Sequence, residues 1–224
     1  MKEPILNEIF RELEKKYSCC QLSGIPIHIL SNKEKEFFSS FMPDAITAIV
    51  VAHHVVTVEE WTWYQPFRGS ERCDADDHTF EVCRRIEDSL KKEGFKSKIV
   101  PYPYESGLEF RNVAQSAGIG QIGKSAFLLH PMWGPWVHLR VLSTEAPVKK
   151  IQSLSKNSQD VCGDCTKCMD SCPAGAFTHG FNGLVCRRYR KEKGEYTPIG
   201  RGRVYKYCKI CALVCPLGKI KILP

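Results

Sequence analysis

The run Cys162-Gly-Asp-Cys165-Thr-Lys-Cys168-Met-Asp-Ser-Cys172-Pro173 decides how this chain is interpreted. Its spacing is C-x2-C-x2-C-x3-C-P, in which three thiolates converge on one iron–sulfur cubane and the fourth cysteine ligates a second one. A shorter run, Cys208-Lys-Ile-Cys211-Ala-Leu-Val-Cys215-Pro216, repeats the pattern without its first member. The isolated Cys186 supplies the missing thiolate, so the chain offers eight ligands for two [4Fe-4S] clusters.

The two runs predict two ligand sets that exchange their last members. We expect one cluster on Cys162, Cys165, Cys168 and Cys215, and the other on Cys172, Cys186, Cys208 and Cys211. Zinc is the alternative, because C-x2-C pairs also form zinc ribbons. Zinc does not require the C-x3-C-P endings, and this chain has two of them, which favours iron–sulfur clusters.

Disulfides are the other use of clustered cysteines, and they occur in exported proteins. The first residues, MKEPILNEIF, lack the apolar core and cleavage site of a secretory signal. We therefore expect a cytoplasmic protein with reduced thiols. Four further cysteines have no ligand spacing and are interpreted as buried small hydrophobes or free thiols: Cys19, Cys20, Cys73 and Cys83.

Length and composition restrict the class of protein. The 224 residues accommodate one large domain, or a medium domain with a small one. Apolar residues make up 43% and charged residues 25%, which is ordinary globular usage and argues against global disorder or a fibrous repeat. No apolar run approaches the roughly 18 residues of a transmembrane helix, so we expect no membrane association.

Positive charge is concentrated near the end of the chain. Residues 187–224 hold eleven Lys and Arg against Glu192 and Glu195, a local charge of +9 in a chain of net charge +7. Such a patch binds nucleic acid or an acidic partner. Alternatively, it offsets the negative charge of thiolate-ligated clusters. The patch contains no recognition motif for nucleic acid, which favours a structural or partner-docking role.

The residues before the cysteines alternate between helix and strand patterns, which predicts an α+β (α/β) fold class. We expect helices over 2–17, from Asp76 or Asp77 to about Lys92, and from Glu105 to Ala117, and a buried strand over 45–58. The apolar face of the middle helix is expected to be Phe80, Cys83, Ile86 and Leu90. The polar stretch 146–160 predicts a boundary between a mixed α/β cofactor domain (1–152) and a ferredoxin-like double-cluster domain (153–224). The second domain is expected to need metal to fold.

Four further segments carry a resemblance to a known group. Ala117-Gly-Ile-Gly-Gln-Ile-Gly-Lys-Ser125 is a glycine-rich turn, and Leu128-Leu-His-Pro131, Gly134-Pro-Trp136 and the segment Leu139 to Pro147 follow it. With the cysteine runs, this order resembles the epoxyqueuosine reductase and reductive dehalogenase superfamily over roughly residues 100–216. The resemblance implies a short, cobalamin-dependent iron–sulfur oxidoreductase. In it, two [4Fe-4S] clusters pass electrons to a corrinoid that reduces a small or tRNA-borne substrate.

The resemblance also implies site residues. Gly118, Gly120, Gly123 and Lys124 would bind the cofactor, since glycine lets a backbone approach a ligand closely. A dinucleotide fingerprint is the alternative, but this turn follows a predicted helix rather than a strand. The superfamily has a proton donor ahead of the turn, where this chain has Tyr104 beside Glu105. A tyrosine with a pKa of about 10 stays protonated at neutral pH and can deliver a proton. An ordinary loop role is the alternative for both residues.

The same resemblance also implies binding partners, and three residues of this chain differ from the superfamily pattern. The resemblance implies an electron donor of the ferredoxin or flavodoxin type, and tRNA as a possible partner of the basic patch 187–224. His138, Arg140 and Glu145 depart from the pattern of the superfamily, which leaves the substrate open. The competing function is an electron-transfer or activating partner without a substrate of its own.

Overall fold

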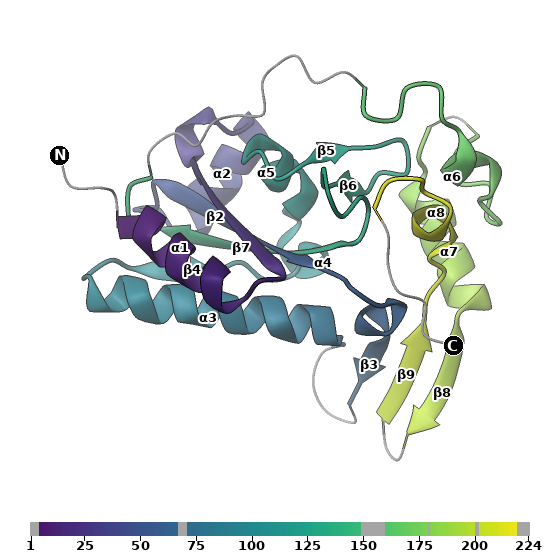
Figure 1. Cartoon of the computed structure of the whole chain (residues 1–224), viewed down its shortest axis with the longest axis horizontal. Coiled ribbons are helices and arrows are strands. Elements are labelled where there is room, and N and C mark those ends of the chain that lie inside the picture. Colours follow the sequence, from purple (N-terminus) through teal and green to yellow (C-terminus); the bar gives the residue numbers. More distant parts are fainter. Residues whose placement is uncertain (1–4, 67–70, 149–159, 179, 200–201, 219–224) are drawn as a thin grey trace. The chain divides into compact units, whose positions relative to one another are not determined.

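The computed structural model describes residues 5–66, 71–148, 160–178, 180–199 and 202–218, which divide into two compact units (Figure 1). Unit 1 contains Met1–His54, His78–Gln121 and His138–Ser158. Unit 2 contains Val55–Asp77, Ile122–Val137 and Gln159–Pro224. The predicted boundary at residues 152 and 153 lies outside the described residues. Besides the cysteine region, unit 2 contains Val55–Asp77 and Ile122–Val137, which come from the part of the sequence before the cysteines.

Unit 1 is built on a four-stranded sheet in the order β1-β2-β7-β4 (Figure 1). Its strands are β1 (Cys20–Pro26), β2 (Thr47–His54), β7 (Val137–Thr144) and β4 (Ser97–Ile99). β1 pairs antiparallel with β2, and β4 pairs antiparallel with β7, so the α+β form of the predicted class is confirmed. β2 is the predicted buried strand, but it ends at His54, and Val58–Trp61 form the 3-10 helix η2 instead.

Helices cover both faces of this sheet (Figure 1). α1 (Ile5–Lys16) and α3 (Asp74–Lys92) lie on one face, and α2 (Asn32–Phe41) and α5 (Phe110–Ser116) lie on the other. The core under α1 and α3 includes Leu6, Ile9, Phe10, Leu22, Ile49, Val51, Val82, Cys83, Ile86, Leu90 and Leu142. Phe80 was expected in this face but is 39% exposed, and Val82 is buried in its place. No helix in the described ranges has the length and apolarity that a bilayer crossing requires.

The single helix predicted from Glu105 to Ala117 is wrong, because the structure has two helices there. α4 (Pro103–Ser106) ends at Gly107, whose φ of 73° is left-handed. That conformation is easy for glycine and stops a helix. α5 then begins at Phe110. Glu105 therefore lies in α4, in a separate short helix from the glycine-rich turn.

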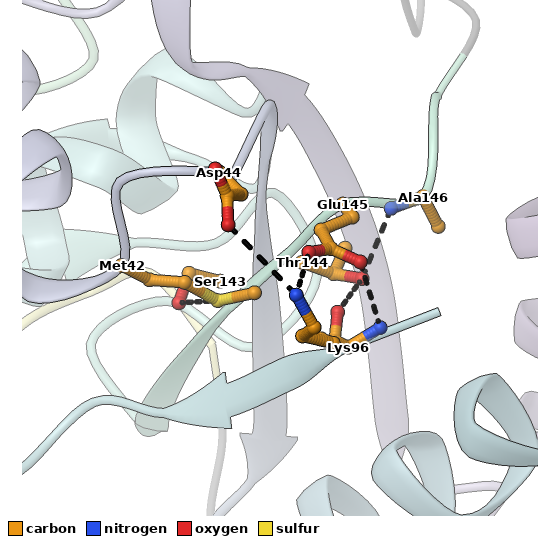
Figure 2. A network of polar contacts seen from close by, with 7 residues as sticks. All are labelled: Met42, Asp44, Lys96, Ser143, Thr144, Glu145 and Ala146. Atoms are coloured by element: carbon orange, nitrogen blue, oxygen red, sulfur yellow. Dashed lines mark hydrogen bonds and ion pairs between the residues drawn. The ribbon is translucent and has the colours of Figure 1, made fainter. Parts of the chain in front are cut away.

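A polar network joins the end of β7 to the start of β4 (Figure 2). Lys96 Nζ lies 3.1 Å from Glu145 Oε1 and 3.8 Å from Asp44 Oδ2. The Lys96 backbone amide donates to Glu145 Oε2 over 3.2 Å, and the Thr144 hydroxyl donates to the Lys96 carbonyl over 2.8 Å. Hydrogen bonds from Lys96 hold the pKa of Glu145 below its ordinary value. Glu145, one of the departures from the superfamily pattern, is thus a structural residue of unit 1.

Unit 2 combines a small sheet with short helices. β3 (Trp63–Gln65), β9 (Gly202–Lys206) and β8 (Glu195–Ile199) form an antiparallel sheet in that order (Figure 1). The remaining elements are β5 (Gln121–Ile122), β6 (Leu128–Leu129), α6 (Lys167–Asp170), α7 (Gly183–Lys193) and α8 (Ile210–Leu213). Val55, Cys73, Ala75, Trp136 and Ala212 form its core. Trp61 packs against this core, with its ring centroid 5.4 Å from that of Trp136.

Candidate metal centre

The eight cysteines of the two runs all belong to unit 2. Cys168 lies on α6, Cys186 on α7 and Cys211 on α8, and the others lie in the adjoining turns. Every one of the eight is a half-buried thiol: Cys162, Cys165, Cys168, Cys172, Cys186, Cys208, Cys211 and Cys215. Half-burial suits a thiolate that ligates a cluster, because the sulfur is reachable and yet shielded from bulk water.

The first predicted set is close together. Burial raises the pKa of Cys168, and the charges of Cys162, Cys165 and Cys215 raise it further. The pKa of Cys215 is raised by burial and then by Cys162 and Cys165. Like charges act on a pKa in this way only at short range. Cys215 follows Cys168 by 47 positions in the sequence, so the fold brings the last cysteine of the second run to the first run.

The second predicted set is close together as well. Burial raises the pKa of Cys211 to about 12, and the charges of Cys208, Cys186 and Cys172 contribute. The pKa of Cys186 is raised by burial and by Cys172 and Cys208, while Arg190 lowers it. A metal that ligates these sulfurs displaces their protons and cancels their mutual repulsion. The donor set therefore fits two all-thiolate metal centres.

The remaining cysteines have a different environment. Cys20, Cys73 and Cys83 are buried, and Cys19 is half-buried. Burial raises the pKa of Cys20 and of Cys73 to about 12, so both stay protonated at neutral pH. Cys83 belongs to the core of unit 1 and Cys73 to the core of unit 2. These three serve as small apolar core residues.

The second half of the glycine-rich turn contacts the first cysteine loop. The Lys124 backbone N–H donates to Cys162 Sγ over 3.4 Å. Lys124 Nζ donates to the carbonyl oxygens of Gly163 and Cys165. A Cβ at Gly123 would lie 2.4 Å from Leu129 Cδ1 and 3.1 Å from Cys162 Sγ, so a larger residue would press on the Leu129 side chain and on the cysteine. Gly123 and Lys124, for which cofactor binding stays a prediction, thus contact the first cysteine loop.

A second glycine contact supports the other end of the cysteine region. Gly134 has a φ of 56°, and a Cβ there would lie 2.0 Å from the carbonyl oxygen of Leu217. Gly218, with a φ of 70°, faces the carbonyl of Trp133 in the same way. The backbone after Cys215 therefore lies directly against the turn of Gly134. The sequence analysis points to the motif that begins at Gly134, but it does not predict the contact of this glycine with residues 217 and 218.

The remaining candidates lie in unit 1. Gly118 ends the α5 region with a φ of 78°, and Gly120 is buried. Tyr104 is 69% exposed, and Glu105 beside it on α4 is also exposed. The ring centroid of Tyr104 is 6.1 Å from that of Tyr102.

Tyr102 lies at the centre of a cluster that sequence reasoning missed. The Tyr102 hydroxyl is 3.4 Å from Nε2 of the buried His138. The Arg140 guanidinium lies 4.8 Å from the Tyr102 ring centroid and 5.4 Å from that of Phe80. His138 and Arg140 are two apart on β7, so their side chains share a face. The sequence offers one indication of this cluster, because His138 and Arg140 both differ from the superfamily pattern.

Comparison with known proteins agrees with the metal centre. Residues 161–218 match the family described as a 4Fe-4S double cluster binding domain. The epoxyqueuosine reductase of Bacillus subtilis (strain 168) is 32% identical over 162 residues, which are 69% of this chain and 40% of that protein. The epoxyqueuosine reductase of Bacillus anthracis is 34% identical over 120 residues, 50% of this chain and 30% of that protein. The chain thus spans less than half the length of these relatives.

Solved structures share the fold. An epoxyqueuosine reductase with a tRNA-Tyr epoxyqueuosine-modified tRNA stem loop has a TM-score of 0.69 and 22% identity, covering 98% of this chain and 67% of that one. A reductive dehalogenase structure that suggests a mechanism for B12-dependent dehalogenation has a TM-score of 0.56 and 17% identity, covering 80% and 27%. The expected resemblance to this superfamily is confirmed.

Proposed function

We propose that this chain is an iron–sulfur reductase in which two [4Fe-4S] clusters carry electrons to a cobalamin-type cofactor. The observation that carries the proposal is the separation of eight thiols into two neighbouring sets of four. Cys162, Cys165, Cys168 and Cys215 hold one cluster. Cys172, Cys186, Cys208 and Cys211 hold the other. Two clusters on one small scaffold form an electron path, with potentials set by hydrogen bonds, charge and exposure.

Unit 1 is the proposed cofactor unit. A bound corrinoid would supply a cobalt ion that can take up electrons and then, in its low-valent state, deliver them to the substrate. Gly118 and Gly120 are the proposed contacts, since they add no side chain where a flat cofactor approaches the backbone. The likeness to a structure described in terms of B12-dependent dehalogenation supports this assignment. Gly123 and Lys124 remain proposed cofactor residues as well, and both also contact the cysteine loop.

Tyr104 and Glu105 are the proposed proton donors. Both are exposed on α4, where a substrate can reach them. A phenol is protonated at neutral pH and transfers its proton only to a strongly basic group, such as one formed on reduction. Tyr102 and His138 form a second, more buried pair of proton-bearing groups in the same unit.

The substrate class follows the relatives. A solved relative binds a tRNA stem loop, which supports a tRNA-borne substrate, and the dehalogenase likeness supports a small organic one. Electrons come from a ferredoxin- or flavodoxin-type donor, because such carriers deliver single electrons at low potential.

A second candidate function is electron transfer to another protein without a substrate of its own. It is favoured by the engagement of Gly123 and Lys124 with the cysteine loop, which gives this part of the glycine-rich turn a role beside the clusters that needs no further cofactor. In that case the chain would deliver electrons to a partner that holds the reactive centre.

Anaerobic metal analysis tests the proposal. The chain, purified without oxygen and incubated with cobalamin, is assayed for iron, sulfide and cobalt, and its visible spectrum is recorded. About eight iron atoms and about one cobalt per chain are expected for a double-cluster corrinoid reductase. Iron without cobalt favours the electron-transfer function. Zinc in place of iron overturns both.

A further inference from the structure

We propose that the exposed face of α7 is the docking surface through which a small acidic electron carrier reduces the cluster of Cys186. The inference rests on the proposed iron–sulfur function and adds the site of electron entry. We define the α7 face as Leu184, Arg187, Arg188 and Lys191. The partner is a protein of the flavodoxin type, with acidic residues around its redox group.

α7 has two distinct faces. Residues three and four apart lie on the same side of a helix. Cys186, Tyr189 and Arg190 are half-buried, so they form the inner face. The four residues of the α7 face are all exposed and follow the spacing i, i+3, i+4 and i+7.

The inner face is fixed to unit 2. The Arg190 guanidinium lies 4.2 Å from the ring centroid of Tyr207, whose hydroxyl donates to Glu71. Cys186 belongs to the second ligand set. The α7 face is therefore the outer surface of a helix whose inner surface carries a cluster ligand.

The α7 face carries an apolar spot at its beginning. Leu184 is 74% exposed, and its neighbours Phe181 and Val185 are 41% and 37% exposed. These three side chains border an open hollow of about 570 Å³ that Arg187 also lines. Exposed apolar groups gathered in this way are typical of protein contact sites. Asn182 accepts hydrogen bonds from the amides of Leu184 and Val185, so its side chain caps the helix start.

Positive charge follows the apolar spot along α7. α7 contains five basic residues, Arg187, Arg188, Arg190, Lys191 and Lys193, against the single acid Glu192. Arg188 forms an ion pair with Glu192, with Nε of the arginine 3.2 Å from Oε1 of the glutamate, and both side chains are exposed. The remaining field attracts an anionic surface and accelerates the encounter with it. Protein interfaces combine apolar and charged groups in this way, and transient redox complexes use small ones.

A protein partner fits this face better than RNA does. Recognition of single-stranded RNA combines phosphate contacts with aromatic side chains on which bases stack. Leu184, the most exposed side chain of the spot, is aliphatic, and the one aromatic ring of the spot, Phe181, already packs against Phe177 with ring centroids 5.3 Å apart. Position supports the same partner, because Val185 and Arg187 adjoin Cys186 in the chain. A carrier seated on them lies beside the cluster ligand, as electron transfer requires. The carrier is oxidised by one electron, and the oxidised cluster is reduced by one.

Stopped-flow reduction of the cluster-loaded chain by reduced flavodoxin tests the proposal. The test variants are Arg187→Glu with Lys191→Glu, which reverse two charges one turn apart, and Leu184→Ser. The matched control is Lys15→Glu with Lys16→Glu, also two exposed cations in the last turn of a helix. Iron, sulfide and visible absorption are measured for every variant, and binding of a tRNA transcript is measured in parallel.

We expect the charge reversal to slow reduction by at least about tenfold at low salt. Raising the salt should slow the wild-type reaction and bring the two rates together. Leu184→Ser should slow reduction severalfold at every salt concentration, and the control should stay within about twofold of wild type. All four proteins should hold equal iron.

Two results overturn the inference while the proposed function stands. One is a charge-reversed chain with full clusters that is reduced at the wild-type rate. The other is a loss of tRNA binding with an unchanged reduction rate, which assigns the α7 face to RNA. A wild-type chain that takes up no iron overturns the proposed function, and the docking surface with it.

Discussion

The backbone N–H of Lys124 donates a hydrogen bond to Sγ of Cys162 over 3.4 Å. The two residues are 38 positions apart, and the contact joins the glycine-rich turn to the first cysteine loop. Hydrogen bonds to a ligating sulfur withdraw negative charge from a cluster and raise its reduction potential. The turn thus contributes to the electronic environment of the first ligand set as well as to its position.

Gly123→Ala should damage the first cluster selectively. Its new Cβ would lie 2.4 Å from Leu129 Cδ1 and 3.1 Å from Cys162 Sγ, so the buried Leu129 side chain and the Cys162 sulfur must both shift. We expect iron content to fall from about eight toward about four atoms per chain. Gly183→Ala is the matched control, because its Cβ meets only a Phe181 ring carbon at 3.7 Å. Equal iron in both variants would contradict this role of Gly123.

Lys124→Met should lower the reduction potential of one cluster without removing it. The change keeps the apolar stem but deletes the cation that donates to the carbonyls of Gly163 and Cys165. A cluster gains negative charge on reduction, so the loss of a nearby positive charge disfavours the reduced state. A redox titration followed by electron paramagnetic resonance measures the shift. Lys124→Arg should restore most of it, and a potential unchanged in Lys124→Met would refute the effect.

Cys186→Ala should remove one cluster and leave the other. Only the set of Cys172, Cys186, Cys208 and Cys211 loses a ligand, so about four of about eight iron atoms should remain. Cys168→Ala should cause the same loss in the other set. Cys19→Ala, which changes a half-buried cysteine of unit 1, is the control and should retain all the iron. If either ligand variant keeps full iron content, the assignment of the sets is wrong.

Glu145→Gln should destabilise unit 1 at neutral pH and have no effect in acid. Hydrogen bonds from Lys96 lower the pKa of Glu145 in the folded chain. A lowered carboxyl pKa contributes stability above the unfolded value of about 4.3 and loses it as the pH falls through the folded value. The urea midpoint of the variant should therefore lie below that of wild type at pH 7, and the gap should close in acid. Glu36→Gln, at an exposed helical position, is the control and should keep the wild-type midpoint at pH 7, and a Glu145→Gln midpoint equal to wild type at pH 7 would contradict the prediction.

Tyr104→Phe should slow turnover by at least about tenfold and leave iron and corrinoid content unchanged. The variant keeps the ring and removes only the acidic proton, and general acids contribute a factor of this size or more. Steady-state turnover with the metal analysis measures both quantities. A wild-type rate in Tyr104→Phe, together with a slow Tyr102→Phe, would transfer the role to the pair of Tyr102 and His138.

The features that the sequence predicted are local ones. The cysteine spacing predicts the metal centre because neighbouring ligands are held by short stretches of backbone. The apolar periodicity over residues 2–17 predicts α1, whose Leu6, Ile9 and Leu13 are buried. The break between α4 and α5 was not predicted, because Gly107 lies within an otherwise helical sequence pattern. The left-handed φ of Gly107 ends α4 there.

The features that the sequence did not predict are contacts between distant segments. β3 pairs with β9 across 140 residues, as Gln65 and Tyr205 illustrate with a hydrogen bond of 3.0 Å. Nothing in either strand specifies the other, because strand pairing depends on the whole packed unit. The contact of Gly123 and Lys124 with the cysteine loop is of the same kind, because the turn itself does not specify it. A glycine that allows close approach does not reveal what approaches it.

Unit 2 is assembled from three separate segments of the chain, and this limits how its double-cluster part can be moved into another protein. A fragment that begins at Gln159 would contain all eight ligands but neither β3 nor Trp136. β9 would then present an open strand edge on one side, which invites aggregation. Ala212, which is fully buried beside one of the cysteines, would lose its tryptophan neighbour. The double-cluster part therefore cannot be transferred as one continuous segment, because the three segments of the chain that form unit 2 must be moved together.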